Sequence, residues 1–272
     1  MFQLFTEAEK LSIKIITLTT DFGLRDPYAA EMKAAILGIC PTATIVDVTH
    51  EVEKFNVRMG AYILASAARY YPKGAIHVAV VDPEVGTRRE QLLIQTHNGF
   101  FIGPNNGLLF PASEREGIVE VRQITNHKLM LPEVSNTFHG RDLFAPAAAY
   151  LANGVAPTEF GPEIRNFVKP DFAQATRIGT VLSGEVLYID GFGNVVTNIS
   201  DRDMTLLHLR KCCSIKFNDC QLQIEIGKTY GQIKPHQFLA LIGSQGYLEV
   251  AINQGNAAEK LGAKIGDKIS LE

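Results

Sequence analysis

The sequence is poor in cysteine. It has four cysteines among 272 residues, at positions 40, 212, 213 and 220. Their spacing matches neither a zinc site nor a Cys-x-x-Cys motif, and so few cysteines in so long a chain do not form a disulfide framework. We therefore expect reduced thiols that serve mainly for packing, in a cytoplasmic protein.

Long apolar runs and an excess of positive charge are also missing. No apolar run approaches the roughly 20 residues that a helix needs to span a bilayer. Residues 1–12 lack the regions of a signal peptide, and we expect them to form a short extension before the first strand. A net charge of −3 offers no basic surface for a nucleic acid. We therefore expect neither a membrane nor a nucleic acid as a partner.

Familiar nucleotide-binding and catalytic motifs are absent as well. No G-x-G-x-x-G follows the first apolar run, and the P-loop pattern G-x-x-x-x-G-K-[S/T] does not occur. Neither H-E-x-x-H nor G-x-S-x-G appears. These absences weaken the interpretation as a generic nucleotide-binding α/β enzyme.

The first half of the sequence alternates between strand and helix patterns. Strands are predicted at 14–20, 43–50 and 75–82, and helices at 27–40 and 57–71. We expect Asp26 to cap the first helix, with Pro27 at its first position. Continuous apolar strands separated by helices predict a mainly parallel sheet that is covered on both faces.

The pattern changes along the second half. Asn98-Gly99 between apolar runs predicts a hairpin within 91–103, and a helix is predicted at 141–154. The proline-rich stretch from Pro157 to Pro170 has no period, and short apolar runs with turns follow it, which is typical of a small β-barrel or sandwich. The sequence therefore predicts an α/β domain over 12–165 and a smaller, barrel-like β domain over 176–272.

Polar residues follow the predicted strands at the edge where open α/β sheets bind ligands. Asp21 ends the first strand, Asp82 ends the third, and His139 lies in the later polar stretch T-F-H-G-R-D. Each has an ordinary explanation when it is taken alone. Asp21 could cap its loop, His139 could be structural, and residues 88–89 could form a solvated turn.

Taken together, the polar motifs resemble one family. They are T-T-D-F-G, V-V-D-P-x-V-G-T-x-R, P-N-N-G, T-F-H-G-R-D-L-F-A-P, I-D-x-F-G-N-x-x-T-N and G-S-x-G-x-L-E-V-A-x-N-x-G. In this order they are similar to the motifs of S-adenosylmethionine hydrolases, also called S-adenosylmethionine hydroxide adenosyltransferases, from about Ile15 onward. Fluorinating and chlorinating enzymes are relatives of that family. The resemblance implies that water attacks C5′ of S-adenosylmethionine to give adenosine and methionine, without cofactor or metal. It also implies a homotrimer with active sites between subunits.

The resemblance further implies roles for individual residues. The family's water-positioning group corresponds to Asp82, Arg89 and His139, with Arg89 rather than Arg88 at the family's spacing. The implied substrate contacts are Asp21 at the ribose hydroxyls, Phe55 and Phe138 beside the sugar and base, Asp190 and Asn194 at the methionine ammonium and the adenosine, Tyr230 stacked on adenine, Ser244 at the methionine carboxylate, and the backbone of Ile252 and Gln254 at the adenine edge.

These residue types suit the chemistry. A carboxylate can accept two charge-assisted hydrogen bonds from a vicinal diol, and an aromatic ring provides a flat partner for adenine. Because the sulfonium is already an activated leaving group, the main requirement is the placement of one water molecule. We therefore expect Asp82, held by Arg89, to orient the water, while His139 shares or receives its proton.

One departure and two other functions remain open. Glu84 stands where the family usually has glycine, and a positive φ at that position would cost roughly 1–2 kcal/mol. A halide-dependent adenosyl halogenase would use the same substrate but would lack the Asp–Arg–His group. A non-catalytic protein that binds adenosine or S-adenosylmethionine would keep the pocket without turnover, and a related adenosyl sulfonium could be the true substrate.

Overall fold

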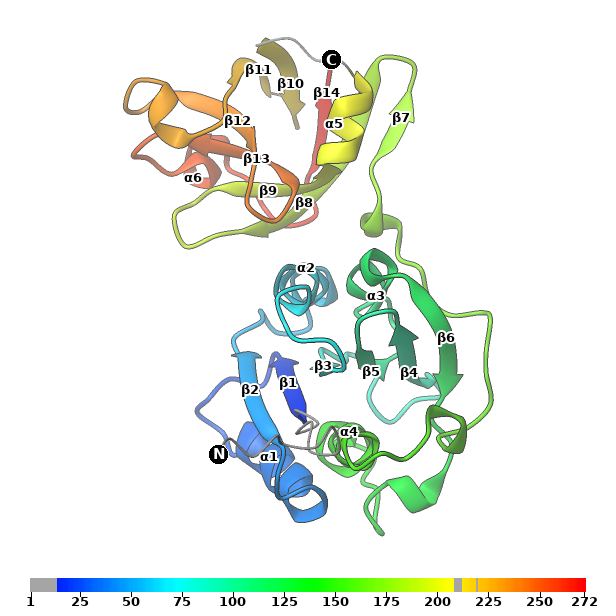
Figure 1. Cartoon of the computed structure of the whole chain (residues 1–272). Helices are drawn as coiled ribbons and strands as arrows, with labels where there is room; N and C mark the ends of the chain where they lie inside the picture. Colours follow the sequence, from blue (N-terminus) through cyan, green and yellow to red (C-terminus); the bar gives the residue numbers. More distant parts are fainter. Residues whose placement is uncertain (1–13, 208–211, 219) are drawn as a thin grey trace, which may run out of the picture. The chain divides into compact units, whose positions relative to one another are not determined.

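The computed structural model describes residues 14–207, 212–218 and 220–272 (Figure 1). Its internal contacts divide the chain after Val168, inside the proline-rich stretch, into two compact units. The extension expected over residues 1–12 lies outside the described residues.

The first unit is built on a six-stranded sheet with the strand order β2-β1-β3-β5-β4-β6. Its strands are β1 (Ile15–Thr20), β2 (Thr44–Thr49), β3 (Ile76–Val80), β4 (Gln91–Thr96), β5 (Phe100–Pro104) and β6 (Ile118–Gln123). The first three and β5 run parallel, while β4 is antiparallel to both β5 and β6. The mainly parallel sheet is therefore confirmed, and so is the hairpin at Asn98-Gly99, which joins β4 to β5.

Helices cover both faces of this sheet. They are α1 (Tyr28–Ile39), α2 (Val57–Ala68), α3 (Phe110–Glu116) and α4 (Ala145–Ala152), with short 3-10 turns at His127–Leu129 and Pro157–Glu159. The pair α1 and α4 packs on one face and the pair α2 and α3 on the other (Figure 1). This arrangement buries β1 and β3 from both sides, as the sequence predicts, while β2 at the edge of the sheet stays partly exposed.

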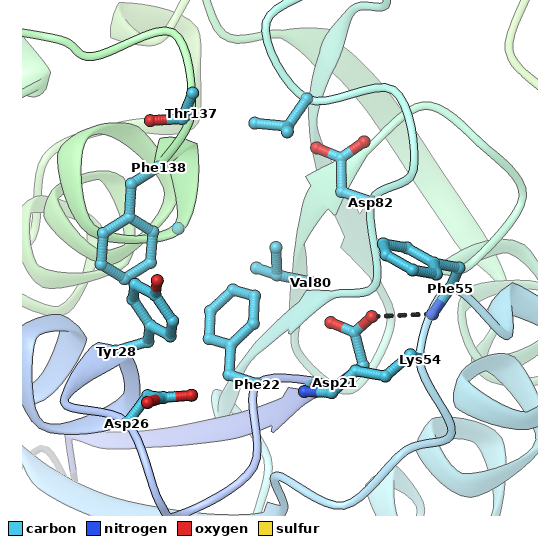
Figure 2. A pocket seen from close by; sticks show the side chains of 12 residues that line it. Asp21, Phe22, Asp26, Tyr28, Lys54, Phe55, Val80, Asp82, Thr137 and Phe138 are labelled. Carbon is cyan, nitrogen blue, oxygen red and sulfur yellow. Dashed lines mark hydrogen bonds between the residues drawn. The ribbon is translucent and has the colours of Figure 1, made fainter.

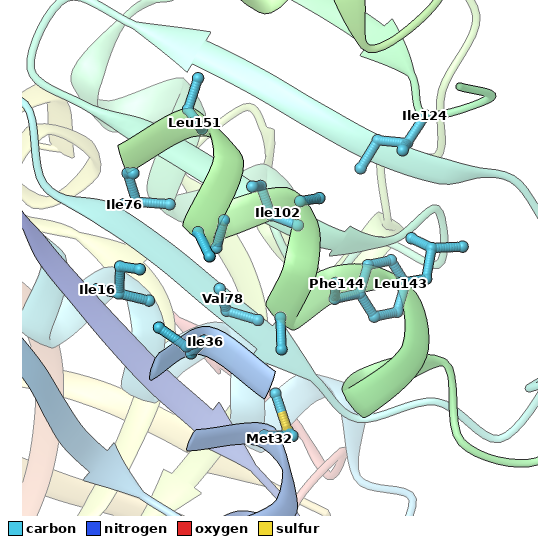
Figure 3. Packing of buried hydrophobic residues seen from close by; sticks show 14 of the residues in the cluster. Ile16, Met32, Ile36, Ile76, Val78, Ile102, Ile124, Leu143, Phe144 and Leu151 are labelled. Carbon is cyan, nitrogen blue, oxygen red and sulfur yellow. The ribbon is translucent and has the colours of Figure 1, made fainter. Parts of the chain in front are cut away.

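The core beneath α1 and α4 anchors the strands that lead to the polar residues. Ile16 of β1 and Val78 of β3 pack with Met32, Ile36 and Phe144 in one buried cluster (Figure 3). Fully burying a side chain of this size contributes about 1.5–3 kcal/mol. Asp21 and Asp82 therefore follow strands that are anchored in the buried core of the unit.

Two details of the helices differ from the prediction. Helix α1 begins after Pro27, which occupies the N-cap, and no side chain hydrogen bonds to its first turn. The predicted cap by Asp26 is therefore wrong, because the helix starts one residue too late for that carboxylate to reach the exposed N–H groups. The helix predicted from residue 141 begins as a π-helical turn, Gly140–Phe144. Pro146 has no N–H, so a regular α-helical hydrogen bond back to Asp142 cannot form.

The second unit is a closed β-barrel with one additional strand. Its strands are β7 (Thr176–Ile178), β8 (Val181–Ile189), β9 (Val195–Ser200), β10 (Cys212–Phe217), β11 (Cys220–Ile226), β12 (Phe238–Ile242), β13 (Tyr247–Ile252) and β14 (Lys268–Leu271). They follow the order β14-β10-β11-β12-β13-β9-β8-β7, and β14 also pairs with β8. That pairing closes the ring, with β7 attached to it through β8, and confirms the predicted barrel-like domain.

Short helical pieces before and between these strands were not predicted. They are α5 (Asp201–Leu207), α6 (Ala257–Leu261) and 3-10 turns at Asp171–Ala173 and Tyr230–Gln232. Each spans two turns or fewer, which is too short to show a helical period in the sequence.

The thiols and helices of the described residues add two observations. Cys40 is a buried free thiol and Cys220 an exposed one, and Cys213 is buried. Within the part of the chain that the structure describes, none of the helices combines the length and apolar character needed to cross a bilayer.

Candidate functional site

The carboxylate, guanidinium and imidazole expected to act together are in contact. Asp82 stands two residues after β3, and Arg89 Nε donates to its Oδ1 at 3.0 Å and to its Oδ2 at 2.9 Å. Arg89 Nη2 donates to Oδ2 as well, and it lies 2.8 Å from Nδ1 of His139. Only 4% of either charged side chain is exposed. This multiple pairing fixes the orientation of the carboxylate.

The same arginine determines the tautomer of His139. A guanidinium carries only donors, so Nδ1 must accept the hydrogen bond, and the proton of the neutral ring lies on Nε2. Burial, followed by the charge of Arg89, lowers the pKa of His139 from 6.5, against the opposing effects of Asp82 and Asp142. The imidazole is therefore neutral at pH 7 and presents Nε2–H as a donor.

Two neighbouring loops are joined around Asp21, directly after β1. The backbone N–H of Phe55 donates to Asp21 Oδ2 at 2.9 Å, and Lys54 Nζ donates to the Asp21 carbonyl (Figure 2). His50 Nδ1 lies 2.8 Å from Thr20 Oγ1. Asp21 is 94% buried by these contacts (6% exposed), and its Oδ1 has no hydrogen-bond partner among the described residues. The carboxylate is thus fixed through one oxygen.

A cavity of about 350 Å³ lies beside these carboxylates. Its lining residues are Asp21, Phe22, Asp26, Tyr28, Lys54, Phe55, Val80, Asp82, Val85, Thr137, Phe138 and Gly140. Three of the rings form an edge-to-face cluster with centroids 5.1–5.9 Å apart, and they stand across the cavity from the two strand-end carboxylates (Figure 2). An apolar wall facing a few convergent polar groups is typical of a small-molecule site.

Phe55 has an unusual backbone for a bulky residue. Its φ is 64°, and 68% of the residue is exposed. A non-glycine residue in the left-handed region costs roughly 1–2 kcal/mol, and such strain clusters at ligand-binding sites. The strained residue is the one whose N–H donates to Asp21.

The turn after β3 accommodates Glu84 without strain. Glu84 is exposed, and its φ is not positive. Its N–H lies 3.3 Å from Asp82 Oδ1, and its carbonyl accepts from Thr87. The left-handed residue of the turn is Gly86, with φ 79°, where a Cβ would stand 2.2 Å from the Asn136 carbonyl. The strain considered for Glu84 does not arise, because the turn places its one left-handed residue at Gly86.

In the second unit, Asp190 and Asn194 form a tight turn between β8 and β9. Asp190 Oδ1 accepts from the N–H groups of Phe192 and Asn194, each at 2.9 Å. Asn194 Nδ2 donates to Asp190 Oδ2 at 2.9 Å. Gly193, with φ 82°, completes the turn. The two expected contact residues are therefore brought together by their own hydrogen bonds.

The other expected contacts of the second unit lie on neighbouring segments. Tyr230 begins a 3-10 turn and is 42% exposed, and its OH donates to Glu249 Oε1 at 2.5 Å. Ser244 is exposed in the turn between β12 and β13. Ile252 ends β13, and Gln254 follows with φ 54°. The backbone N–H and C=O groups that follow β13 thus belong to an irregular segment and lie outside the regular hydrogen-bonding pattern of the sheet.

Some residues of the site were not expected from the sequence. Asp26, Tyr28 and Lys54 line the cavity, and Glu249 bonds to Tyr230. Asp26 follows Asp21 by five residues in the same loop, which was a usable signal, but the residue was interpreted as a helix cap. Glu249 lies inside the motif G-S-x-G-x-L-E-V-A-x-N-x-G, where its charge within an apolar run was the available sign.

Metal ligation has no support in the described ranges. Among residues 14–207, 212–218 and 220–272, no three His, Cys, Asp or Glu side chains gather into a group that could hold a metal ion.

Fold and site together define a class of protein. An α/β unit carries a buried Asp–Arg–His group beside a pocket, and a closed β-barrel follows it in the chain. The model of the SAM hydroxide adenosyltransferase N-terminal domain matches residues 16–161, and that of the corresponding C-terminal domain matches residues 184–270. The chain belongs to the SAM hydroxide adenosyltransferase family.

Individual relatives agree with this assignment. A protein of Salinispora tropica named (R)-S-adenosyl-L-methionine hydrolase is 36% identical over 259 residues, covering 94% of this chain and 97% of its own. A fluorinase of Actinoplanes is 32% identical over 219 residues, covering 70% and 73%. The crystal structure of an uncharacterized conserved protein from Thermotoga maritima matches with a TM-score of 0.87 and 34% identity, covering 94% of this chain and 99% of the other.

Proposed function

We propose that this protein is an enzyme that hydrolyses S-adenosylmethionine to adenosine and methionine. The observation that carries the proposal is the buried contact of Asp82, Arg89 and His139, with Asp82 in the wall of the pocket. The full-length similarity to a relative named as a hydrolase of this substrate supports it.

The reaction is a nucleophilic substitution at C5′ of the substrate. The water oxygen forms a bond to C5′ as the C5′–S bond breaks, and the electron pair stays on sulfur, which leaves as neutral methionine. Holding one water in line can supply several kcal/mol. Charge is dispersed or annihilated along this path, so the apolar wall of Phe22, Tyr28 and Phe138 favours the transition state relative to bulk water.

Asp82 orients the attacking water in this mechanism. Its carboxylate faces the pocket and is held in place by Arg89, so it accepts a hydrogen bond from the water and takes up the released proton before it passes to solvent. His139 supports Arg89 through Nδ1. His139 was expected to share or receive the water's proton. With Nδ1 accepting from Arg89 and the proton on Nε2, we assign it the sharing role alone, as a hydrogen-bond donor, and assign uptake of the proton to Asp82.

Residues of both domains contact the substrate in this proposal. The α/β domain, over 12–165, carries the water-positioning residues together with Asp21, whose Oδ1 faces the ribose hydroxyls. The barrel domain, over 176–272, contributes the adenine and methionine contacts. The contacts assigned to substrate are Asp21, Phe55, Phe138, Asp190, Asn194, Tyr230, Ser244, Ile252 and Gln254.

Assembly and location belong to the same proposal. We infer a homotrimer in which one subunit's α/β domain and a neighbour's barrel domain share each active site. We also infer a cytoplasmic location, which the free thiols of Cys40 and Cys220 support.

A direct assay tests the proposed reaction. Purified protein is incubated with S-adenosylmethionine in halide-free buffer, and adenosine and methionine are measured together. We expect both products in equal amounts, with Asp82→Asn at least about a hundredfold slower, because the amide lacks the charge that Arg89 holds in place and cannot take up the water's proton. Full hydrolysis by both Asp82→Asn and His139→Ala would refute the assigned roles.

The same assay distinguishes the other functions. A halogenase would need added chloride or fluoride and would release a halogenated adenosine. A binding protein would hold adenosine without turnover. A faster reaction with another adenosyl sulfonium would keep the chemistry and change the substrate.

A further inference from the structure

Glu249 is a buried carboxylate in the middle of β13. Only 7% of it is exposed. Its neighbours Leu248 and Val250 belong to the barrel core, so strand alternation directs Glu249 to the opposite face. Leu241 stands opposite Glu249 on β12, and Ile233 packs against the small apolar cluster that contains Leu241. The side chain therefore lies on the outer face of the barrel, close to where the segment around residue 233 covers that face.

This one carboxylate is linked to three of the four barrel segments to which ligand contacts were assigned. Oε1 accepts from the OH of Tyr230 at 2.5 Å. Oε2 lies 2.6 Å from the point where a Cβ on Gly243 would stand, at the start of the turn that contains Ser244. The charge of Asp190, in the third segment, also acts on Glu249.

Stability alone gives no reason for a carboxylate at this position. Burial raises the pKa of Glu249, the charge of Asp190 raises it further, and the hydrogen bond from Tyr230 opposes them. No basic side chain among the described residues forms an ion pair with Glu249. A buried charge without a counter-ion is costly, and an apolar residue of similar volume would avoid that cost.

The ring of Tyr230 needs a partner of this kind. It is 42% exposed at the start of a 3-10 turn, and a side chain in that setting has several rotamers available. A short hydrogen bond to a fixed carboxylate selects one of them before a ligand arrives, so less side-chain freedom is lost on binding.

We propose that Glu249 is a positioning residue for the ligand site of the barrel domain, where it orients the Tyr230 ring and spaces the Gly243 turn. This proposal rests on the proposed function, because it assigns adenosine as the ligand that meets Tyr230. Glu249 acts through Tyr230 and the turn, without touching the reacting atoms.

A double-mutant cycle tests the coupling. The dissociation constant for adenosine and the KM and kcat for S-adenosylmethionine are measured for the full-length wild type, Tyr230→Phe, Glu249→Ala and the double variant. Each single change is expected to raise the dissociation constant and KM about five- to tenfold and to leave kcat within about twofold. The double variant is expected to have a dissociation constant and a KM no higher than those of the single variant that binds less tightly, because both changes remove the same hydrogen bond.

Three further variants separate positioning from folding. Glu249→Gln keeps an acceptor for the Tyr230 OH and is expected to stay within about twofold of wild type. Gly243→Ala places a methyl group against Oε2, so it is expected to weaken binding in the wild-type background and much less in Glu249→Ala. Glu225→Ala changes an exposed glutamate of β11 and serves as the matched control.

The outcomes are distinguishable. The proposal is overturned if Glu249→Ala lowers only the melting temperature, or if the effects of Tyr230→Phe and Glu249→Ala multiply. Hydrolysis by the wild type would still stand in either case. If the wild type binds adenosine without hydrolysing S-adenosylmethionine, the proposed function fails and the binding cycle still decides on Glu249. A wild type that binds neither compound overturns both.

Discussion

Among single residues, Arg89 holds the candidate site together. Its guanidinium contacts both Asp82 oxygens and Nδ1 of His139. The direction of the carboxylate and the tautomer of the imidazole therefore depend on the same side chain. A lysine would carry the same charge on a compact ammonium, without the planar fork. A lysine at position 89 therefore keeps the positive charge and removes the planar hydrogen-bonding geometry, so the effect of each on activity can be told apart.

Arg89→Lys tests this dependence. We expect kcat for adenosine release to fall about a hundredfold with KM changed less than threefold, because a small misplacement of the aimed group is enough to lose in-line attack. The matched control is Arg88→Lys, at the exposed neighbouring position, which should behave as wild type. A kcat for Arg89→Lys within threefold of wild type would show that charge alone suffices.

The fall of kcat/KM at low pH should reflect the protonation of His139. Its pKa is lowered from 6.5 by burial and by Arg89, so the neutral form persists below that pH. Protonation of Nδ1 would set an N–H against the Arg89 donor, so kcat/KM should fall only below pH 6.5 and stay level between pH 7 and 8. Rates measured from pH 4.5 to 8 for wild type and His139→Gln test this. A midpoint above 6.5 that vanishes in the variant would contradict it.

The residues of the site show how far sequence reasoning reached. Asp82 and Arg89 share one turn, whereas His139 belongs to a distant segment that only the family resemblance joined to them, and the structure supplies their contacts and the tautomer. Glu249 was missed because alternation in Y-L-E-V-A-I is compatible with an ordinary solvent-facing glutamate. Ile233 packs against the apolar cluster that contains Leu241, the residue opposite Glu249, and no local pattern encodes that packing.

Among the secondary-structure elements, one row of buried side chains in register crosses the parallel strands around a histidine. Thr17 of β1, His77 of β3 and Phe101 of β5 stand in register on three neighbouring strands. Thr17 Oγ1 lies 2.8 Å from His77 Nδ1, and the His77 ring stacks on Phe101 with centroids 4.9 Å apart. Burial lowers the pKa of His77 to about 4. The sheet therefore holds a neutral imidazole.

His77 should make the stability of the first unit depend on pH. Between the unfolded value near 6.5 and the folded value of about 4, the unfolded chain binds the proton more readily, so stability should decline as the pH falls. The full loss is about 3 kcal/mol. Urea unfolding at several pH values should show a steeper decline for wild type than for His77→Gln, with His127→Gln, at an exposed position, as control. Equal slopes for all three would contradict the prediction.

Helices and strands were predicted correctly where they are long enough to show a regular spacing of apolar residues. Strands β1 to β3 and helices α1 and α2 were predicted within a few residues, because their apolar spacing extends over several turns or a full strand. β7, α5 and α6 are too short to show such a pattern. The π-helical turn before α4 depends on the missing N–H of Pro146, a backbone effect that hydrophobic spacing does not report.

For the whole molecule, the important feature is the division of assigned residues between two units. Asp21, Asp82 and His139 belong to the first unit, whereas Asp190 and Tyr230 belong to the second. If each active site joins one subunit's α/β domain to a neighbour's barrel, defects in different units should complement each other after subunit exchange.

Mixing two inactive variants tests this arrangement. Asp82→Asn and Asp190→Ala are mixed in equal amounts, dissociated and reassociated, and adenosine release is measured beside the mass from light scattering. Random exchange should restore about one quarter of wild-type activity, since half of the α/β domains and half of the barrels are intact. A mixture that forms trimers and stays inactive would place each site within a single subunit.

The closure of the barrel has a consequence for biogenesis. Strand β14 pairs with both β8 and β10, so the ring cannot close before residues 268–271 have left the ribosome. Until then two strand edges are bare, and bare edges are templates for pairing with other chains. Contacts between the ends of a domain also form slowly. The interval between synthesis of β8 and docking of β14 is therefore when the nascent protein is most exposed to aggregation and in greatest need of chaperones.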